Sequence, residues 1–125
     1  MQSHYETLKE IEAVVSGFEN CTTGKEEFTH LSHLTVATYY IHSSTPDAAL
    51  EQMRLGLLRF LDHHGINRAR YDERLTAAWI EKIRGFIKQA NEQIEADEHL
   101  DADASLVAIT NAVLDELGQC RVTLA

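Results

Sequence analysis

Apolar residues recur every three or four positions along most of the chain, and no stretch alternates polar and apolar residues in the manner of a β-strand. This spacing places the apolar side chains on one face of an α-helix. The pattern therefore predicts an all-α fold, with one domain over residues 1–125 that forms a compact helical bundle. The expected helices cover residues 4–18, 24–42, 46–64, 73–96 and 104–117.

Residues with helix-capping side chains stand where these helices are expected to begin. The second helix has two candidate starts, Thr23 with Glu26 three residues later, and Thr29, so its first turn stays open. Proline favours the first position of a helix, and glycine favours the position after its last residue. The remaining signals are Ser3 with Glu6 for the first helix, and Thr45, Pro46 and Gly65 for the third.

The second helix carries the widest apolar arc in the chain. At about 100° per residue, the apolar and histidine side chains between Phe28 and Ile41 fill a continuous arc of roughly 220°. An arc of this width predicts a central helix that several neighbours cover. The remaining side carries Ser32, Thr35, Tyr39 and His42.

The inward faces of the second, third and fourth helices define the expected core. Leu34, Leu57, Ile80 and Ile83 lie on these faces. A chain of 125 residues is long enough to build a single modest core. We therefore expect these four side chains to be almost fully buried.

Two histidines, His30 and His33, fall near the middle of the apolar arc, with Ala37 one turn further along. One interpretation is structural: each imidazole hydrogen-bonds a buried partner, and Ala37 permits close packing of helices. The other is functional, because residues three apart are neighbours on a helix surface and form a natural ligand pair. The pattern leaves both interpretations open.

The start of the fourth helix supplies a second group of polar residues. Asp72 is either the N-cap of that helix or, if the helix extends through it, a carboxylate on the apolar face beside Thr76. Glu73 follows it directly. His64 ends the apolar stripe of the third helix, where an imidazolium interacts well with a helix C-terminus, and Tyr40 lies on the inward arc of the second helix. Both are further candidates for the site.

The net charge of the chain argues against some classes of binding partner. The 20 acidic residues outnumber the 11 basic ones and give a formal net charge of −9. A surface this negative repels phosphate groups, which argues against nucleic acids and anionic membranes as partners. There is also no apolar run of membrane-spanning length and no signal-peptide pattern. The sequence thus predicts a soluble cytoplasmic protein and leaves a small-molecule ligand as its partner.

Familiar catalytic motifs are absent: there is no P-loop, dinucleotide fingerprint, nucleophile elbow or HExxH sequence. Cys21 and Cys120 lie too far apart to form a metal-binding pair, and both are expected to be reduced thiols. The acidic run over residues 95–103 lacks the glycine and the glutamate spacing of a calcium loop. We interpret it as a linker.

The stretch from Phe28 to Arg84 carries F-x-H-x-x-H-L-x-V-A-x-x-Y and, after Gly65, Y-D-E-x-x-T. It resembles a family of small uncharacterised bacterial helical proteins with the pattern FxHxxHLxVAxxY followed by YHETxT. The chain departs from that pattern at Asp72, where the family has histidine, and at Arg74, where it has threonine. The resemblance spans a little under half of the chain and implies a polar site without specifying a reaction.

These groups combine into one hypothesis for function. If the second and fourth helices cross, His30 and His33 approach Asp72 or Glu73, with Thr76 as a hydroxyl partner. Imidazole and carboxylate ligands suit zinc, iron or nickel and leave a coordination position open for water or substrate. Without a metal, the two histidines and Glu73 are candidates for acid–base catalysis. The alternative is a non-catalytic helical binding or interaction protein whose buried histidines are structural.

Overall fold

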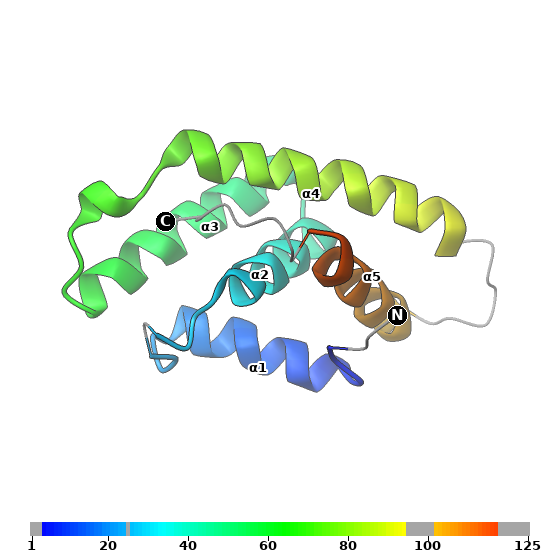
Figure 1. Cartoon of the computed structure of the whole chain (residues 1–125), viewed down its shortest axis with the longest axis horizontal. Coiled ribbons are helices and arrows are strands. Elements are labelled where there is room, and N and C mark those ends of the chain that lie inside the picture. Colours follow the sequence, from blue (N-terminus) through cyan, green and yellow to red (C-terminus); the bar gives the residue numbers. More distant parts are fainter. Residues whose placement is uncertain (1–3, 25, 95–101, 118–125) are drawn as a thin grey trace.

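The computed structural model describes residues 4–24, 26–94 and 102–117. Within these ranges the chain forms helices and no strand, so the predicted all-α fold is confirmed (Figure 1). The described ranges leave out Cys120 and most of the expected acidic linker. The elements are α1 (Leu8–Glu19), α2 (His30–Ser43), α3 (Pro46–His63), the short 3-10 helix η1 (Arg68–Arg70), α4 (Glu73–Ile94) and α5 (Ala102–Leu117).

Helix α2 is the centre of the bundle, as its wide apolar arc predicted. It packs against α1, α3, α4 and α5, and Figure 1 shows it between α1 on one side and α4 on the other. The four residues expected in the core are indeed buried, because each lies at a contact between helices. Their exposed fractions are 0% for Leu34, 2% for Leu57, 4% for Ile80 and 0% for Ile83.

The prediction that Ser32, Thr35, Tyr39 and His42 form the polar side of α2 is partly wrong, because Thr35 is fully buried. Its hydroxyl donates to the carbonyl of Leu31 at 2.8 Å and lies 3.0 Å from the hydroxyl of Tyr5. Thr38, also fully buried, donates to the carbonyl of Leu34 at 2.7 Å. The segment before α1 thus covers the side of α2 that the pattern assigned to solvent, and local hydrogen bonds satisfy its hydroxyl groups.

Two of the expected helix starts are displaced. The first helix begins at Leu8 with a capping box between Thr7 and Glu10, so the predicted start at Ser3 and Glu6 is wrong. The second begins at His30 with Thr29 as its N-cap, which decides against Thr23. The amide groups of Thr22 and Thr23 both donate to the carbonyl of Gly17, so these residues finish α1 and do not open α2.

The third helix begins and ends where its signals predicted. The side chain of Thr45 accepts a hydrogen bond from the amide of Ala48 at 3.2 Å, with proline at the next position. Gly65 has a φ angle of +68°, and the amide of Ile66 donates to the carbonyl of Leu61 at 2.8 Å. This is the Schellman arrangement, in which glycine takes the left-handed conformation.

Helices α1 and α3 cross closely at an aromatic cluster. A Cβ atom added to Gly56 of α3 would lie 2.4 Å from Cε2 of Phe18, so only glycine fits at this crossing. The ring of Phe18 stacks on that of Phe28 with centroids 4.8 Å apart, and Phe28 lies 5.0 Å from Phe60. Aromatic rings in such arrangements stabilise the fold by more than the burial of their apolar surface alone.

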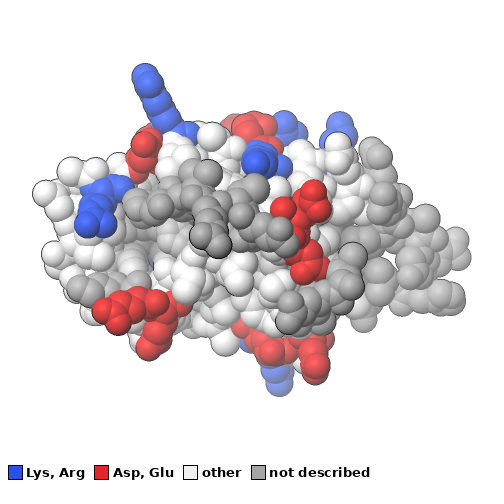
Figure 2. Space-filling model, in the orientation of Figure 1, with Lys and Arg blue, Asp and Glu red and all other residues white. Residues whose placement is uncertain are grey.

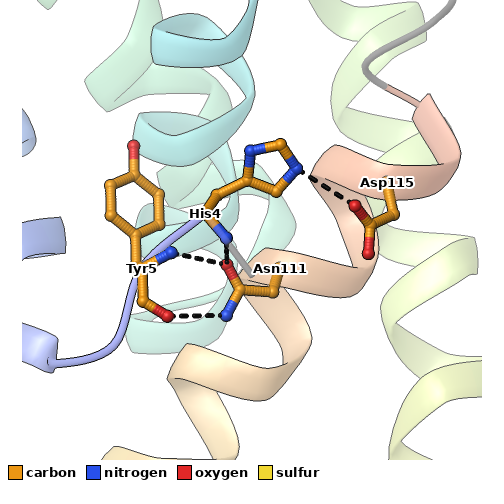
Figure 3. A network of polar contacts seen from close by, with 4 residues as sticks. All are labelled: His4, Tyr5, Asn111 and Asp115. Carbon is orange, nitrogen blue, oxygen red and sulfur yellow. Dashed lines mark hydrogen bonds and ion pairs between the residues drawn. The ribbon is translucent and has the colours of Figure 1, made fainter. Parts of the chain in front are cut away.

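The segment before α1 is fastened to α5 through one amide side chain (Figure 3). Oδ1 of Asn111 accepts hydrogen bonds from the backbone amides of His4 and Tyr5, both at 2.9 Å, and its Nδ2 donates to the carbonyl of Tyr5 at 2.9 Å. Nε2 of His4 lies 3.0 Å from Oδ1 of Asp115. These contacts hold Tyr5 against α2.

Replacing Leu57 with alanine should lower the free energy of unfolding by about 2–5 kcal/mol, because the change leaves a cavity in the core. Urea denaturation of the two proteins measures the loss. The matched control is Leu55→Ala on the same helix, where the leucine is 51% exposed and the expected loss is small. A loss below about half a kcal/mol for Leu57→Ala would contradict the placement of this helix face.

Replacing Asn111 with alanine should cost about 1–3 kcal/mol, because it leaves two backbone amides and one carbonyl without their shared partner. Hydrogen exchange at the His4 and Tyr5 amides should speed up more than exchange in the α2 core. Gln89→Ala, which removes an exposed amide side chain from α4, serves as control. Unchanged exchange at both amides in Asn111→Ala would show that the fastening is absent.

Candidate functional site

His33 lies in the first turn of α2 and is 8% exposed. Its ring centroid is 4.5 Å from that of Phe28, so it joins the aromatic cluster. Burial lowers its pKa from 6.5 to about 4, and the neighbouring His30 acts in the same direction. The side chain is therefore a neutral imidazole at pH 7, and its buried Nδ1 has no hydrogen-bond partner within the described residues.

His30, the first residue of α2, connects this helix to two others. Its Nε2 lies 3.4 Å from the carbonyl oxygen of Leu117 at the end of α5, and its ring meets the edge of Trp79 in α4 at 5.2 Å. Its Nδ1 is buried and, in the part of the chain that is described, has no hydrogen-bond partner. These contacts make His30 a link between α2, α4 and α5.

The structure brings His33 and Thr76 to one small cavity between α2, α3 and α4. Its volume is about 10 Å³, and its wall is formed by carbon atoms, with Ala37 among the residues that line it. A space of that size holds one water molecule at most. The hydroxyl of Thr76 donates to the carbonyl of Asp72 at 2.9 Å, so it is already satisfied.

The two carboxylates expected at this place lie elsewhere. Asp72 is exposed, and its Oδ1 accepts a hydrogen bond from the amide of Leu75 at 3.0 Å, which is the N-cap role. Glu73 is exposed and accepts a hydrogen bond from the hydroxyl of Tyr71 at 2.7 Å, and its other oxygen is 3.9 Å from the guanidinium of Arg54. The helix begins at Glu73, so both side chains leave its first turn toward solvent.

The predicted meeting of a carboxylate with His30 and His33 is therefore not found in the structure. Among the residues described, no group of three or more histidine, cysteine, aspartate or glutamate side chains is arranged to hold a metal ion. What the structure assembles is the pair His33 and Thr76 beside a small apolar cavity. No carboxylate of the described residues hydrogen-bonds His33, and a cavity of about 10 Å³ has no room for a substrate.

The two further candidates lie in different surroundings. Nε2 of His64 is 3.2 Å from the carbonyl of Thr23, and its ring lies 4.4 Å from that of Phe60, so it closes the end of α3 against the loop after α1. Tyr40 is 3% exposed, and its hydroxyl donates to Oε2 of Glu19 at 2.7 Å. Burial, followed by the hydrogen bond to Glu19, raises the pKa of Tyr40.

Tyr40 belongs to a polar cleft that sequence reasoning missed. The cleft has a volume of about 370 Å³ and lies between α1, the C-terminal end of α2 and α3. The only feature of the sequence that pointed to the cleft was the inward position of Tyr40, because a buried tyrosine hydroxyl needs a hydrogen-bond partner. The partner of Tyr40 is Glu19 on α1, and the sequence cannot predict it because it depends on how α1 and α2 pack. The main lining side chains are Glu12, Ser16, Glu19, Tyr39, Tyr40 and Gln52.

On the face shown in Figure 2, lysine and arginine side chains stand apart, with acidic and uncharged residues between them, so the described part of this face has no basic patch. None of the described helices is long and apolar enough to cross a membrane.

Comparison of the chain with protein-family models, curated proteins and solved structures gives no match. The resemblance of residues 28–84 to a bacterial family therefore stays a prediction, and the function has to be argued from the geometry alone.

The free energy of unfolding should fall as the pH drops from about 6.5 to about 4. The reason is His33, whose pKa in the folded chain is about 4, below its ordinary value of 6.5. The unfolded chain therefore takes up this proton more readily, and protonation favours unfolding by roughly 3 kcal/mol at most. Above pH 6.5 the stabilising effect of the neutral imidazole is fully present.

Denaturant melts at several pH values measure this slope, with His33→Gln and His42→Gln compared with the unaltered chain. Glutamine does not titrate, so His33→Gln should flatten the slope between pH 6.5 and 4. His42 is exposed, and its replacement should leave the slope unchanged. Parallel slopes for all three proteins would contradict a buried neutral His33.

Proposed function

We propose that this protein is a non-catalytic helical binding protein that holds a small molecule in the cleft between α1, α2 and α3. The supporting observation is the contrast between the two hollows near the candidate residues. The cleft at Tyr40 measures about 370 Å³, and the cavity at His33 about 10 Å³. Small-molecule sites in proteins usually span about 300–1,000 Å³.

The surroundings of the histidines favour a structural role for them. A general base must reach the proton of a bound substrate directly or through one water molecule. The cavity that His33 borders is small and lined by carbon atoms, and the hydroxyl of Thr76 is engaged by the backbone. In this proposal His30 stabilises the packing of α2 against α4 through the ring of Trp79 and against α5 through the carbonyl of Leu117, and His33 packs on the ring of Phe28 in the aromatic cluster.

A metal site at His30 and His33 is the competing proposal. It is supported by the Nδ1 atoms of both rings, which are buried and lack hydrogen-bond partners in the described ranges. Zinc, iron or nickel sites with three protein ligands would need a further donor, since Asp72 and Glu73 are engaged at the surface. Elemental analysis of the purified protein and of His33→Gln separates the proposals, because only a metal site predicts stoichiometric metal that the substitution removes.

We also propose that the protein works in the bacterial cytoplasm. Cys21 is a free, buried cysteine, and a reducing compartment keeps such a thiol reduced.

Binding in the cleft is tested with three probes that share one skeleton: 2-phenylethylamine, 2-phenylethanol and phenylacetate. We expect at least one to bind saturably and to shift the backbone amide NMR signals of Ser16, Tyr40 and Ser44. Ser16→Trp, at the exposed edge of the cleft, should abolish these shifts by occupying the space. Lys88→Trp on the exposed side of α4 should leave them intact. Absence of saturable shifts with all three probes would overturn the proposed function.

A further inference from the structure

Negative charge without a cationic partner lines one wall of the cleft. Glu12 and Glu19 lie seven residues apart on α1, and both side chains border the cleft. Within the described ranges neither carboxylate forms an ion pair, and no lysine or arginine lines the cleft. Arg59 lies nearby: its Nη1 donates to the backbone carbonyl of Glu19 at 3.2 Å, and its charge acts on the hydroxyl of Tyr40, although it forms no ion pair with the carboxylate.

The carboxylate of Glu19 is held in place by a buried phenol. The hydroxyl of Tyr40 donates to Oε2 at 2.7 Å, and Tyr40 itself is only 3% exposed. Because this phenol is fixed by the core, it restricts the rotamers of Glu19. Oε1 accepts no hydrogen bond from any described residue and is free to accept one from a ligand. Glu19 itself is exposed, so a ligand can reach it, and a carboxylate that is already held in one position loses less conformational entropy when it binds a cation than a mobile one does.

Apolar contact comes from α1 and α2. Val15 lies between the two glutamates on the same face of α1, is 4% exposed and contributes to the lining, and the ring of Tyr39 on α2 meets that of Tyr40 edge-on at a centroid distance of 6.2 Å. An aromatic ring beside a carboxylate is a favourable environment for an organic ammonium group, which gains from both. A bare metal ion is a poorer fit, since among the described residues no group of three ligating side chains converges.

We propose that the ligand of this cleft is an organic cation, an amine that carries an apolar body. Its nitrogen binds Oε1 of Glu19, with Glu12 adding negative potential, and its body lies against Val15 and Tyr39. The net charge of −9 favours the approach of cations to the protein as a whole. The proposal rests on the proposed function and names the chemical class of its ligand.

The experiment ranks the same three probes, whose charges are +1, 0 and −1, by NMR titration of the cleft amides. We expect 2-phenylethylamine to bind about tenfold more tightly than 2-phenylethanol, and phenylacetate to bind most weakly. Glu19→Gln should reduce the advantage of the amine over the alcohol to about twofold or less. Glu81→Gln removes an equal charge from the exposed side of α4 and should preserve the advantage.

The outcomes separate the two proposals. Tighter binding of the alcohol or the carboxylate in the cleft would overturn the cationic ligand while keeping the binding function. An amine advantage that survives in Glu19→Gln would also overturn the proposal, because the carboxylate would not be its cause. Saturable binding of none of the probes would overturn both proposals. Circular dichroism melts of each variant confirm that the fold is retained in every comparison.

Discussion

A helix that is covered on nearly every side has to satisfy its polar groups without water, and α2 imposes this constraint on the rest of the chain. The hydroxyl groups of Thr35 and Thr38 turn back to carbonyls one turn earlier in the same helix. His30 reaches the last carbonyl described in α5. An unsatisfied buried group costs about 1–3 kcal/mol. The two threonine contacts avoid this cost within α2 itself, whereas the contact of His30 also restricts where the end of α5 lies.

The interior around the start of α2 and the cleft at its C-terminal end differ in how much space the packed side chains leave. Around His33 the side chains of α2, α3 and α4 leave a cavity of about 10 Å³. At the C-terminal end of α2 the serine side chains are exposed, and a cleft of about 370 Å³ lies between α1, α2 and α3. His30 and His33 thus lie against packed side chains, whereas the larger cleft with exposed polar side chains lies two to three helical turns away along α2. Buried polar groups are more often satisfied than functional.

Much of the fold could be predicted from periodicity, because α2, α3 and α4 bury stripes with the spacing of a helix. Thr45 and Gly65 fixed the ends of α3 through local hydrogen bonds that depend only on nearby residues. Thr35 could not be placed, since its burial depends on the segment 30 residues earlier that brings Tyr5 over it. The sequence pattern was compatible with Asp72 either as the N-cap of α4 or as a residue within that helix. Because α4 begins at Glu73, Asp72 is the N-cap. The cleft joins residues of three helices, and no pattern within one helix predicts it.

Tyr40 connects the two regions and explains why the cleft has its particular chemistry. Its ring belongs to the buried core, and its hydroxyl reaches the cleft, where it must find an acceptor. Glu19 supplies that acceptor from the last turn of α1, and burial together with this negative charge raises the pKa of the phenol. The phenol therefore stays protonated and remains a donor. A carboxylate accepts a stronger hydrogen bond from the phenol than a neutral acceptor would, and in doing so it also brings a negative charge to the cleft.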